Sequence, residues 1–332
     1  MDVQGILQTR FCKLVGVQYP ICQAGMGFVA PARLAAAVSA AGGLGVIGAG
    51  TMTAAQLREE IRRVRDTTDK PFGVDILFAQ IKAERTDQVI RYTDEVNRQI
   101  EIVLTERVPV LVSGLGTPAG IVPDAHAQGI VVMSLAGNVK QAKRLAADGV
   151  DVIIAQGHEA GGHTGRIGTL ALVPQVVDAV TVPVLAAGGI ADGRGLVAAL
   201  ALGASGVWMG TRFVASEEAL AHLNYKNKIV EIDEEGTVVT RCHSGKPCRL
   251  IRNRFTASWE GREHDILPFP LQMIKVGREA AMKARYEGKV EEGGLAAGQI
   301  SGMITSIKPA GQIVRDVVAE ALAVCQKGLY TR

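Results

Sequence analysis

Residues 152–165 read Val152-Ile153-Ile154-Ala155-Gln156-Gly157-His158-Glu159-Ala160-Gly161-Gly162-His163-Thr164-Gly165. The first four are apolar and typical of a fully buried strand. The stretch then contains four glycines, two histidines and one carboxylate, a composition in which no regular element continues comfortably. A buried strand that ends in a glycine-rich loop is how α/β enzymes offer a side chain to a ligand. We therefore expect a strand over 152–156 and a functional histidine, His163, on the loop that follows.

Seven more apolar, β-branched runs accompany this one, and helical patterns separate them. The eight candidate strands cover residues 19–23, 44–48, 72–76, 109–113, 130–134, 152–156, 183–187 and 206–210. The candidate helices between them cover 32–41, 54–65, 87–106, 118–127, 139–147, 170–180 and 194–202. Continuous rather than alternating hydrophobicity indicates parallel strands that are buried on both faces. Eight such repeats predict an α/β fold of the TIM (β/α)8 barrel type.

A doubly wound sheet is the structural alternative. It would be favoured by a Gly-x-Gly-x-x-Gly turn after the first strand. The first turn instead reads Gln23-Ala24-Gly25-Met26-Gly27-Phe28, and Gly42-Gly43-Leu44-Gly45 precedes a strand rather than opening a helix. The barrel is therefore the favoured interpretation.

The pattern changes after Phe213. Residues 216–228 and 271–287 look helical, 237–240 are a candidate short strand, and 243–270 are polar and basic with prolines. The simplest interpretation is a smaller helical domain, inserted after the eighth strand to cover the substrate. Residues 310–326 have strong helical periodicity and are the candidate last helix of the barrel. We assign 1–214 and 308–332 to the barrel and 215–307 to the smaller domain.

Composition argues against several other classes of protein. Hydrophobic residues fill 48% of the 332 positions, which is ample for a large core. The formal charge of +3 comes from interleaved basic and acidic residues, so neither a nucleic-acid nor a membrane surface is expected. No apolar run reaches the length of a membrane span, and residues 1–5 lack the pattern of a signal peptide. Five dispersed cysteines argue against a disulfide framework and indicate a cytoplasmic protein.

Candidate functional residues follow from the strand ends, because a barrel gathers its functional groups on the loops after its strands. Asp75 ends the third strand, and Gln156 and then His163 follow the sixth. Gly188-Gly189 and Gly210-Thr211 end the seventh and eighth strands. These two loops predict a phosphate site, since their backbone N–H groups can converge on an anion. Tight turns without a ligand are the alternative.

Other common motifs of catalytic sites are absent from the sequence. The sequence has no Gly-x-Ser-x-Gly elbow and no paired carboxylates at strand ends. The spacing of Cys242 and Cys248 around His243 matches no usual zinc site, so no metal is expected. A phosphate cradle, amide groups and one histidine indicate a bound cofactor that carries the difficult chemistry.

Six stretches are specific enough, taken together, to identify a family. They are Pro20-Ile21-Cys22-Gln23-Ala24-Gly25-Met26, Ala41-Gly42-Gly43-Leu44-Gly45, Lys70-Pro71-Phe72-Gly73-Val74-Asp75, Glu159-Ala160-Gly161-Gly162-His163-Thr164-Gly165, Ala186-Ala187-Gly188-Gly189-Ile190-Ala191-Asp192-Gly193 and Met209-Gly210-Thr211-Arg212-Phe213. They resemble the nitronate monooxygenase (2-nitropropane dioxygenase-like) family, which comprises FMN-dependent TIM barrels. The family also contains flavin-dependent enoyl-acyl-carrier-protein reductases and NADH:quinone reductases. The resemblance implies FMN as cofactor, NADH or NADPH as a candidate electron donor, and a small-molecule substrate.

The resemblance also implies individual roles. His163 would be the catalytic base or substrate-orienting group, a task that suits an imidazole with an unperturbed pKa of about 6.5. The cofactor-binding positions divide into three sets: Gln23, Ala24, Gly25 and Met26 along the flavin ring, Asp75 and Gln156 as its hydrogen-bond partners, and Gly188, Gly189, Gly210 and Thr211 around the phosphate. Further cofactor-binding positions taken from the motifs are Gly161, Gly162, Ala187 and Met209.

The resemblance leaves the reaction open. The first expectation is oxidation of alkyl nitronates with O2 to carbonyl compounds and nitrite. Nitronate-oxidising members usually have Arg after the motif histidine, where this chain has Thr164, and the segments 224–228, 246–253 and 297–302 look closer to the enoyl reductase branch. The alternatives are an NAD(P)H-dependent reductase of an enoyl thioester (of acyl carrier protein or coenzyme A) or of a quinone, and a flavin-binding protein without turnover. A homodimer is the candidate assembly.

Some residues keep two interpretations. Lys246, Arg249 and Arg252 could contact a coenzyme A phosphate or could form a solvated basic loop. Glu159 could orient His163 or could bond loop N–H groups. His158 stands at a position that the family motif does not specify and is expected to be structural.

Overall fold

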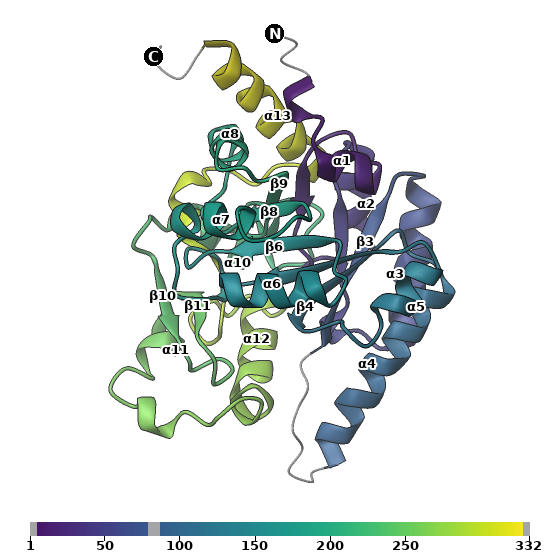
Figure 1. Ribbon diagram of the computed structural model, residues 1–332. Helices are drawn as coiled ribbons and strands as arrows, with labels where there is room; N and C mark the ends of the chain where they lie inside the picture. The colour runs from purple at the N-terminus through teal and green to yellow at the C-terminus, as the bar shows by residue number, and fades with distance from the viewer. Residues whose placement is uncertain (1–4, 79–86, 328–332) are drawn as a thin grey trace.

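The computed structural model describes residues 5–78 and 87–327 and confirms the predicted TIM barrel (Figure 1). Eight parallel strands form one sheet in the order β1-β9-β8-β6-β5-β4-β3-β2. A parallel bridge between Cys22 and Leu44 joins β1 to the residue before β2, so the sheet closes on itself. The strands are β1 (Ile21–Gln23), β2 (Gly45–Gly48), β3 (Phe72–Phe78), β4 (Val110–Gly116), β5 (Val131–Ala136), β6 (Val152–Gln156), β8 (Val184–Ala187) and β9 (Gly206–Met209).

The helices of the barrel also follow the predicted pattern. They are α2 (Ala32–Ala40), α3 (Ala54–Thr67), α4 (Asp87–Thr105), α5 (Val122–Ala127), α6 (Val139–Ala147), α7 (Thr169–Val177), α8 (Gly193–Ala201) and α13 (Ala310–Lys327). Helix α5 begins at Val122, later than the pattern predicts, with a proline in its first turn where the missing N–H costs nothing. Helix α13 returns after the inserted segment and packs against α8. This approach needs a glycine, because a Cβ on Gly193 would lie 2.3 Å from the backbone N of Ala321.

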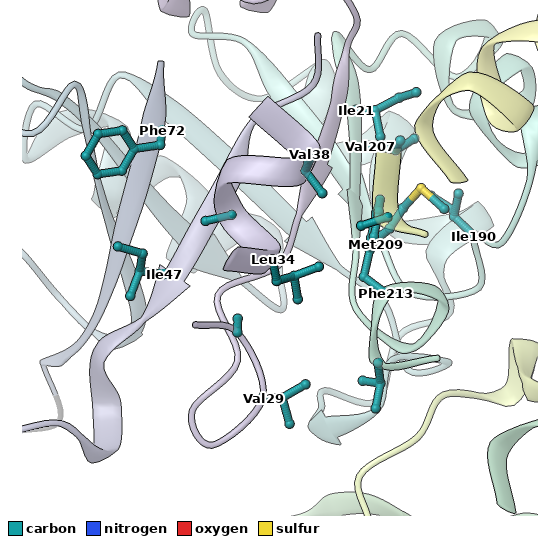
Figure 2. Packing of buried hydrophobic residues seen from close by; sticks show 14 of the residues in the cluster. Ile21, Val29, Leu34, Val38, Ile47, Phe72, Ile190, Val207, Met209 and Phe213 are labelled. Atoms are coloured by element: carbon teal, nitrogen blue, oxygen red, sulfur yellow. The ribbon is translucent and has the colours of Figure 1, made fainter. Parts of the chain in front are cut away.

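Two hydrophobic clusters lie on opposite faces of the strands, which explains why the strands are apolar at every position. One cluster fills the interior of the barrel and includes Val46, Ile154 and Trp208. The other lies between the strands and the helices and includes Ile47 and Ile153, each adjacent in sequence to an interior residue. Figure 2 shows this outer layer around α2, where Leu34 and Val38 lie among residues of several strands.

The first helix closes one end of the barrel. Helix α1 (Arg10–Val15) begins at an N-cap, Thr9, whose side chain accepts a hydrogen bond from the backbone of Cys12. Its Phe11, Cys12 and Val15 belong to the interior cluster. In Figure 1, α1 lies at one end of the barrel, and the inserted segment lies at the other.

The inserted segment, residues 215–307, which we call the lid segment, contains more β-structure than the sequence predicts. Its helices are α10 (Leu223–Glu231), α11 (Arg254–Ala257) and α12 (Arg278–Arg285), with a π-helical turn at Met273–Gly277 before α12. Its strands are β10 (Thr237–Thr240) and β11 (Cys248–Ile251), which pair with each other in antiparallel fashion. Residues 216–222, predicted as the start of a helix, instead run along the barrel, where Ser216 forms a parallel bridge with Lys308. The division of the chain into two domains stays a prediction.

Among the described residues, no helix is both long enough and apolar enough to cross a membrane.

Candidate active site

His163 lies in a short strand rather than on a free loop. Strand β7 (Gly162–His163) pairs with β11 of the lid segment in antiparallel fashion, with His163 opposite Cys248. Gly162 has a φ of 77°, a left-handed conformation that glycine adopts without strain. At the end of β6, Gln156 donates a hydrogen bond of 2.5 Å from Nε2 to the carbonyl oxygen of His163. The histidine is therefore held from the barrel by Gln156 and from the lid segment by β11.

The imidazole of His163 has a partner that the sequence did not reveal. Its Nε2 is joined to Ser244 Oγ by a hydrogen bond of 2.7 Å. Burial first, and then the nearby charges of Lys246 and Arg285, together lower the pKa of His163 to about 4. Since this value lies about three units below neutral pH, His163 is a neutral imidazole at pH 7. At this pH it can accept a proton, or donate a hydrogen bond from its one N–H, but very little of it is the imidazolium ion that acts as an acid.

A second histidine lies beside this pair. His243 precedes Ser244 and is only 5% exposed, and its Nδ1 has no hydrogen-bond partner in the part of the chain described. Burial lowers the pKa of His243 to about 3, with contributions from the charges of Arg285 and His163. The sequence showed His243 only as a member of an improbable zinc motif. Among the described residues, no group of three or more His, Cys, Asp or Glu side chains could hold a metal ion.

The structure favours the interpretation in which Glu159 hydrogen-bonds backbone N–H groups over the one in which it orients His163. Its carboxylate accepts hydrogen bonds from the backbone N and from the Oγ1 of Thr169, both at 2.9 Å, at the start of α7. An acidic side chain at this position satisfies helix N–H groups that otherwise lack partners. His158 is also structural, because its Nδ1 is 2.8 Å from the carbonyl oxygen of Gly165 and braces the loop.

Asp75 ends up in the tightest part of the barrel mouth. Its side chain occupies the space in front of two glycines: a Cβ on Gly25 would lie 2.2 Å from the Asp75 Cβ, and one on Gly114 would lie 2.5 Å from Oδ1. Burial raises the pKa of Asp75 well above its usual range, so the carboxyl is protonated far more readily than in water. Its Oδ1 is buried without a hydrogen-bond partner in the described residues. A buried carboxyl with a raised pKa and an unpartnered Oδ1 is suited to hydrogen-bond a polar ring.

The residues after β1 contribute differently from one another. The side chain of Gln23 is fully buried and bonds both the N and the O of Val46 at 3.1 Å, so it ties β1 to β2. Ala24 faces the barrel interior and Met26 is half-buried at its mouth. Because its side chain bonds Val46, Gln23 could contact a cofactor only through its backbone. The roles of these residues along a flavin stay predictions.

The candidate phosphate site brings together the loops after β8 and β9. Gly188 and Gly189 have φ values of 88° and 75°, and Gly210 precedes the short helix α9 (Thr211–Val214). A Cβ on Gly210 would meet Met26 Sδ at 3.7 Å and Ala24 Cβ at 3.8 Å, which are ordinary van der Waals contacts. Gly298 of the lid segment adds to the site that sequence predicted, since its N–H donates to Thr211 Oγ1 at 2.9 Å.

The other predicted cofactor positions fall into two groups. Gly161 packs against the lid segment, where a Cβ would lie 2.7 Å from the carbonyl carbon of Ala297, and Gly162 has no described atom within 4 Å of such a Cβ. Ala187 faces the barrel interior. Met209 faces the helix layer instead, beside Ile190 and Phe213 (Figure 2). Its backbone still contacts the site loop, because its carbonyl oxygen accepts from Ala24 N at 2.9 Å.

Lys246, Arg249 and Arg252, the three basic residues whose role the sequence left open, lie in three different environments. Arg249 is 4% exposed and donates to the carbonyl oxygen of His158 at 3.0 Å and to Thr237 Oγ1 at 3.1 Å, so it belongs neither to a solvated loop nor to a surface for coenzyme A. Arg252 is exposed and bonds the carbonyl oxygen of Glu235. Lys246 lies over the ring of Phe269, 4.2 Å from its centre, and its charge acts on His163.

Comparisons with known proteins agree with this geometry. A model of the nitronate monooxygenase family matches residues 8–320. The (3aS,4S,5R,7aS)-5-hydroxy-7a-methyl-1-oxo-octahydro-1H-indene-4-carboxyl-CoA dehydrogenase of Rhodococcus jostii is 34% identical, over 95% of this chain and 96% of its own. The structure of FabK from Thermotoga maritima has a TM-score of 0.87 and 38% identity, covering 96% of this chain and 97% of FabK. A nitroalkane oxidase from Streptomyces ansochromogenes has a TM-score of 0.83 and 32% identity, covering 94% of this chain and 98% of its own.

Proposed function

Because this chain belongs to the nitronate monooxygenase family, whose members are oxidoreductases, we propose that it binds FMN and oxidises alkyl nitronates with O2 to carbonyl compounds and nitrite. Three features support the proposal: the strand ends that fit a flavin, the neutral His163, and the surplus of positive charge around that histidine.

The barrel mouth fits a flavin by its chemistry. The unsatisfied carboxyl of Asp75 would hydrogen-bond the ring, with Gly25 and Met26 beside it. Gly188, Gly189, Gly210 and Thr211 would hold the phosphate through backbone N–H groups, as the loops after the seventh and eighth strands often do in this fold. When bound, the flavin supplies the electron-accepting chemistry that no side chain of this site can provide.

His163 is suited to receive a nitronate rather than to protonate a product. Its low pKa keeps the ring neutral at pH 7, and Ser244 Oγ occupies Nε2 at 2.7 Å, so that Nδ1–H would donate a hydrogen bond to a nitronate oxygen, which can only accept one. Such orientation of a catalytic imidazole by a second residue keeps its tautomer and angle constant during turnover.

The observation that carries the choice of substrate is electrostatic. Lys246 and Arg285 both act on His163, and neither forms an ion pair with any carboxylate whose side chain the structure describes. A nitronate is an anion, and its charge would balance these cations. A neutral substrate would leave them unbalanced.

The second candidate is NAD(P)H-dependent reduction of an enoyl thioester of coenzyme A or acyl carrier protein. Two observations favour it: Thr164 replaces the arginine usual after the motif histidine in nitronate-oxidising members, and the relative from R. jostii is by name a dehydrogenase of a coenzyme A thioester. Against it stands the low pKa of His163, because reduction of a double bond needs a proton donor.

One experiment separates the two candidates. The purified holoenzyme is mixed without oxygen with ethyl nitronate, and separately with NADH or NADPH, while the visible absorbance of the flavin is followed. Bleaching by the nitronate, followed by nitrite formation when O2 is admitted, is the expected result. Bleaching by the pyridine nucleotide alone would overturn the nitronate proposal in favour of the reductase.

A further inference from the structure

A guanidinium group at the end of α12 is buried without a counterion. Arg285 is 8% exposed, and no carboxylate forms an ion pair with it in the part of the chain described. Its contacts are long: Nε is 3.4 Å from the carbonyl oxygen of Gly294, Nη1 is 3.5 Å from that of Gly27, and the group lies 5.6 Å from the ring centre of Phe28. A guanidinium offers five N–H donors and stays charged. Most of the hydrogen-bonding capacity of Arg285 is therefore unused.

His243 is the second buried group with unused capacity. Its Nδ1 has no partner among the described residues, and it faces Gly294, where a Cβ would lie 3.0 Å from that nitrogen. Its backbone is held firmly, because a Cβ on Gly277 would lie only 1.9 Å from the His243 carbonyl oxygen. The imidazole thus has a fixed position beside Gly294, the same residue that Arg285 contacts.

Both groups act on the catalytic histidine. The charge of Arg285 disfavours protonation of His163 and of His243, and no carboxylate contributes to either histidine. Ser244, which bonds His163, is the residue after His243. Arg285 and His243 therefore lie within electrostatic reach of His163, on the lid side of the active site.

A buried cation without a counterion is costly, and natural proteins usually pair it or bind an anion with it. We propose that Arg285 and His243 form a subsite that binds an anionic two-oxygen group of the substrate, a carboxylate or a nitronate, and holds it against His163. The inference rests on the proposed function in one respect, which is that the substrate binds beside His163. Arg285 supplies charge and paired N–H donors, a geometry that matches a planar two-oxygen anion. His243 supplies one further hydrogen bond from a neutral ring.

The subsite predicts a selectivity that does not depend on turnover. Hexanoate and hexanamide have the same shape but differ in charge, so their dissociation constants from the holoenzyme are compared by isothermal titration calorimetry. We expect hexanoate to bind about tenfold or more tightly than hexanamide, as expected for hydrogen bonds to a charged group. Equal affinities would overturn the inference, even if nitronates are oxidised. If hexanoate binds tightly to an enzyme that does not oxidise nitronates, the subsite is supported and the proposed function is wrong.

Variants assign the selectivity to the two residues. Arg285→Gln removes the charge, and we expect it to weaken hexanoate about tenfold while hexanamide and FMN bind as before. His243→Gln keeps a side chain of similar polarity, and we expect a smaller loss, about threefold to fivefold. Arg252→Gln, which changes an exposed arginine of the same lid segment, is the matched control and should change neither constant. If Arg285→Gln does not fold, His243→Gln is the deciding variant. An unchanged ratio of the hexanoate and hexanamide dissociation constants in a folded variant would overturn the assignment.

Discussion

Asp75 on the barrel and Arg285 on the lid segment are both buried ionisable side chains, but the protein treats their charges in opposite ways. Burial between Gly25 and Gly114 raises the pKa of Asp75, so that its charged form is disfavoured. Arg285 cannot lose its charge and keeps it without a carboxylate partner among the described residues. The barrel side is thus suited to a ring with hydrogen-bonding groups and no net charge at that point, and the lid side is suited to an anion.

The two sides also differ in what limits the ligand that each can bind. On the barrel side a single Cβ at Gly25 or Gly114 would collide with Asp75. On the lid side Arg285 and His243 have unused hydrogen-bond capacity. We therefore expect steric fit to govern binding on the barrel side and charge to govern binding on the lid side.

The largest effect is expected where the two sides meet. His163→Ala should keep FMN bound and lower kcat about 10²–10⁴-fold, the range typical for loss of a positioned acid–base group. Steady-state kinetics and the visible spectrum of the variant measure the two properties. His126→Ala is the matched control, because His126 is a surface residue paired with Asp151. Unchanged turnover in His163→Ala would remove this residue from the mechanism.

A change at Ser244 sharpens the same point. Ser244→Ala removes the partner of His163 Nε2 but leaves the imidazole in place. We expect kcat to fall less than about tenfold, since one neutral hydrogen bond contributes about 1 kcal/mol. The pH profile of kcat should shift together with the pKa of His163. A profile identical to that of the unmodified protein would show that Ser244 does not position the ring.

A steric change on the barrel side affects the stability of the fold rather than kcat. Gly25→Ala places a methyl group 2.2 Å from the Asp75 Cβ, and overpacking of this kind costs about 1–3 kcal/mol. We expect a lower free energy of unfolding in urea and weaker FMN binding in a fluorescence titration, with hexanoate selectivity unaffected in the holoenzyme that remains. Gly120→Ala is the control, because a Cβ there meets no described atom within 4 Å. A Gly25→Ala variant that binds FMN normally would contradict the tight barrel side.

The smallest expected effect concerns the charge of Asp75. In the unfolded chain this carboxyl ionises above pH about 3.9, whereas in the folded protein it keeps its proton to higher pH. The free energy of unfolding should therefore fall as pH rises from about 4 towards the raised pKa. Asp75→Asn has no proton to lose, so the variant should gain stability relative to the unmodified protein between pH 4 and pH 8, by on the order of 1 kcal/mol.

Urea unfolding of the apo protein at a series of pH values tests this expectation. Asp69→Asn, at an exposed aspartate, is the control and should follow the unmodified protein at every pH. Parallel curves for Asp75→Asn and the unmodified protein would mean that the carboxyl is already ionised when folded, and the contrast with Arg285 would disappear.

Much of the barrel could be predicted because its signals are local. The run Val152–Gln156 is apolar at every position since one face packs inside the barrel and the other against helices, and seven similar runs repeat the pattern. The same logic placed Gln156 at the end of β6 and Gly210 directly after β9, whereas Asp75, predicted to end its strand, lies inside β3, which continues to Phe78. Glu159 could not be settled, because its partner Thr169 is ten residues away and only the start of α7 brings it close.

By itself the sequence determined the alternation of strands and helices, the family and the histidine that the site is built around, because these depend on runs and motifs within short segments. Only the tertiary structure decided that His163 belongs to a strand paired with β11, that Ser244 bonds its ring, and that, among the described residues, Arg285 has no carboxylate partner and His243 Nδ1 has no hydrogen-bond partner. These groups lie about 80 to 120 residues along the chain from His163. Their chemistry arises from burial and proximity, which no local pattern of residues specifies.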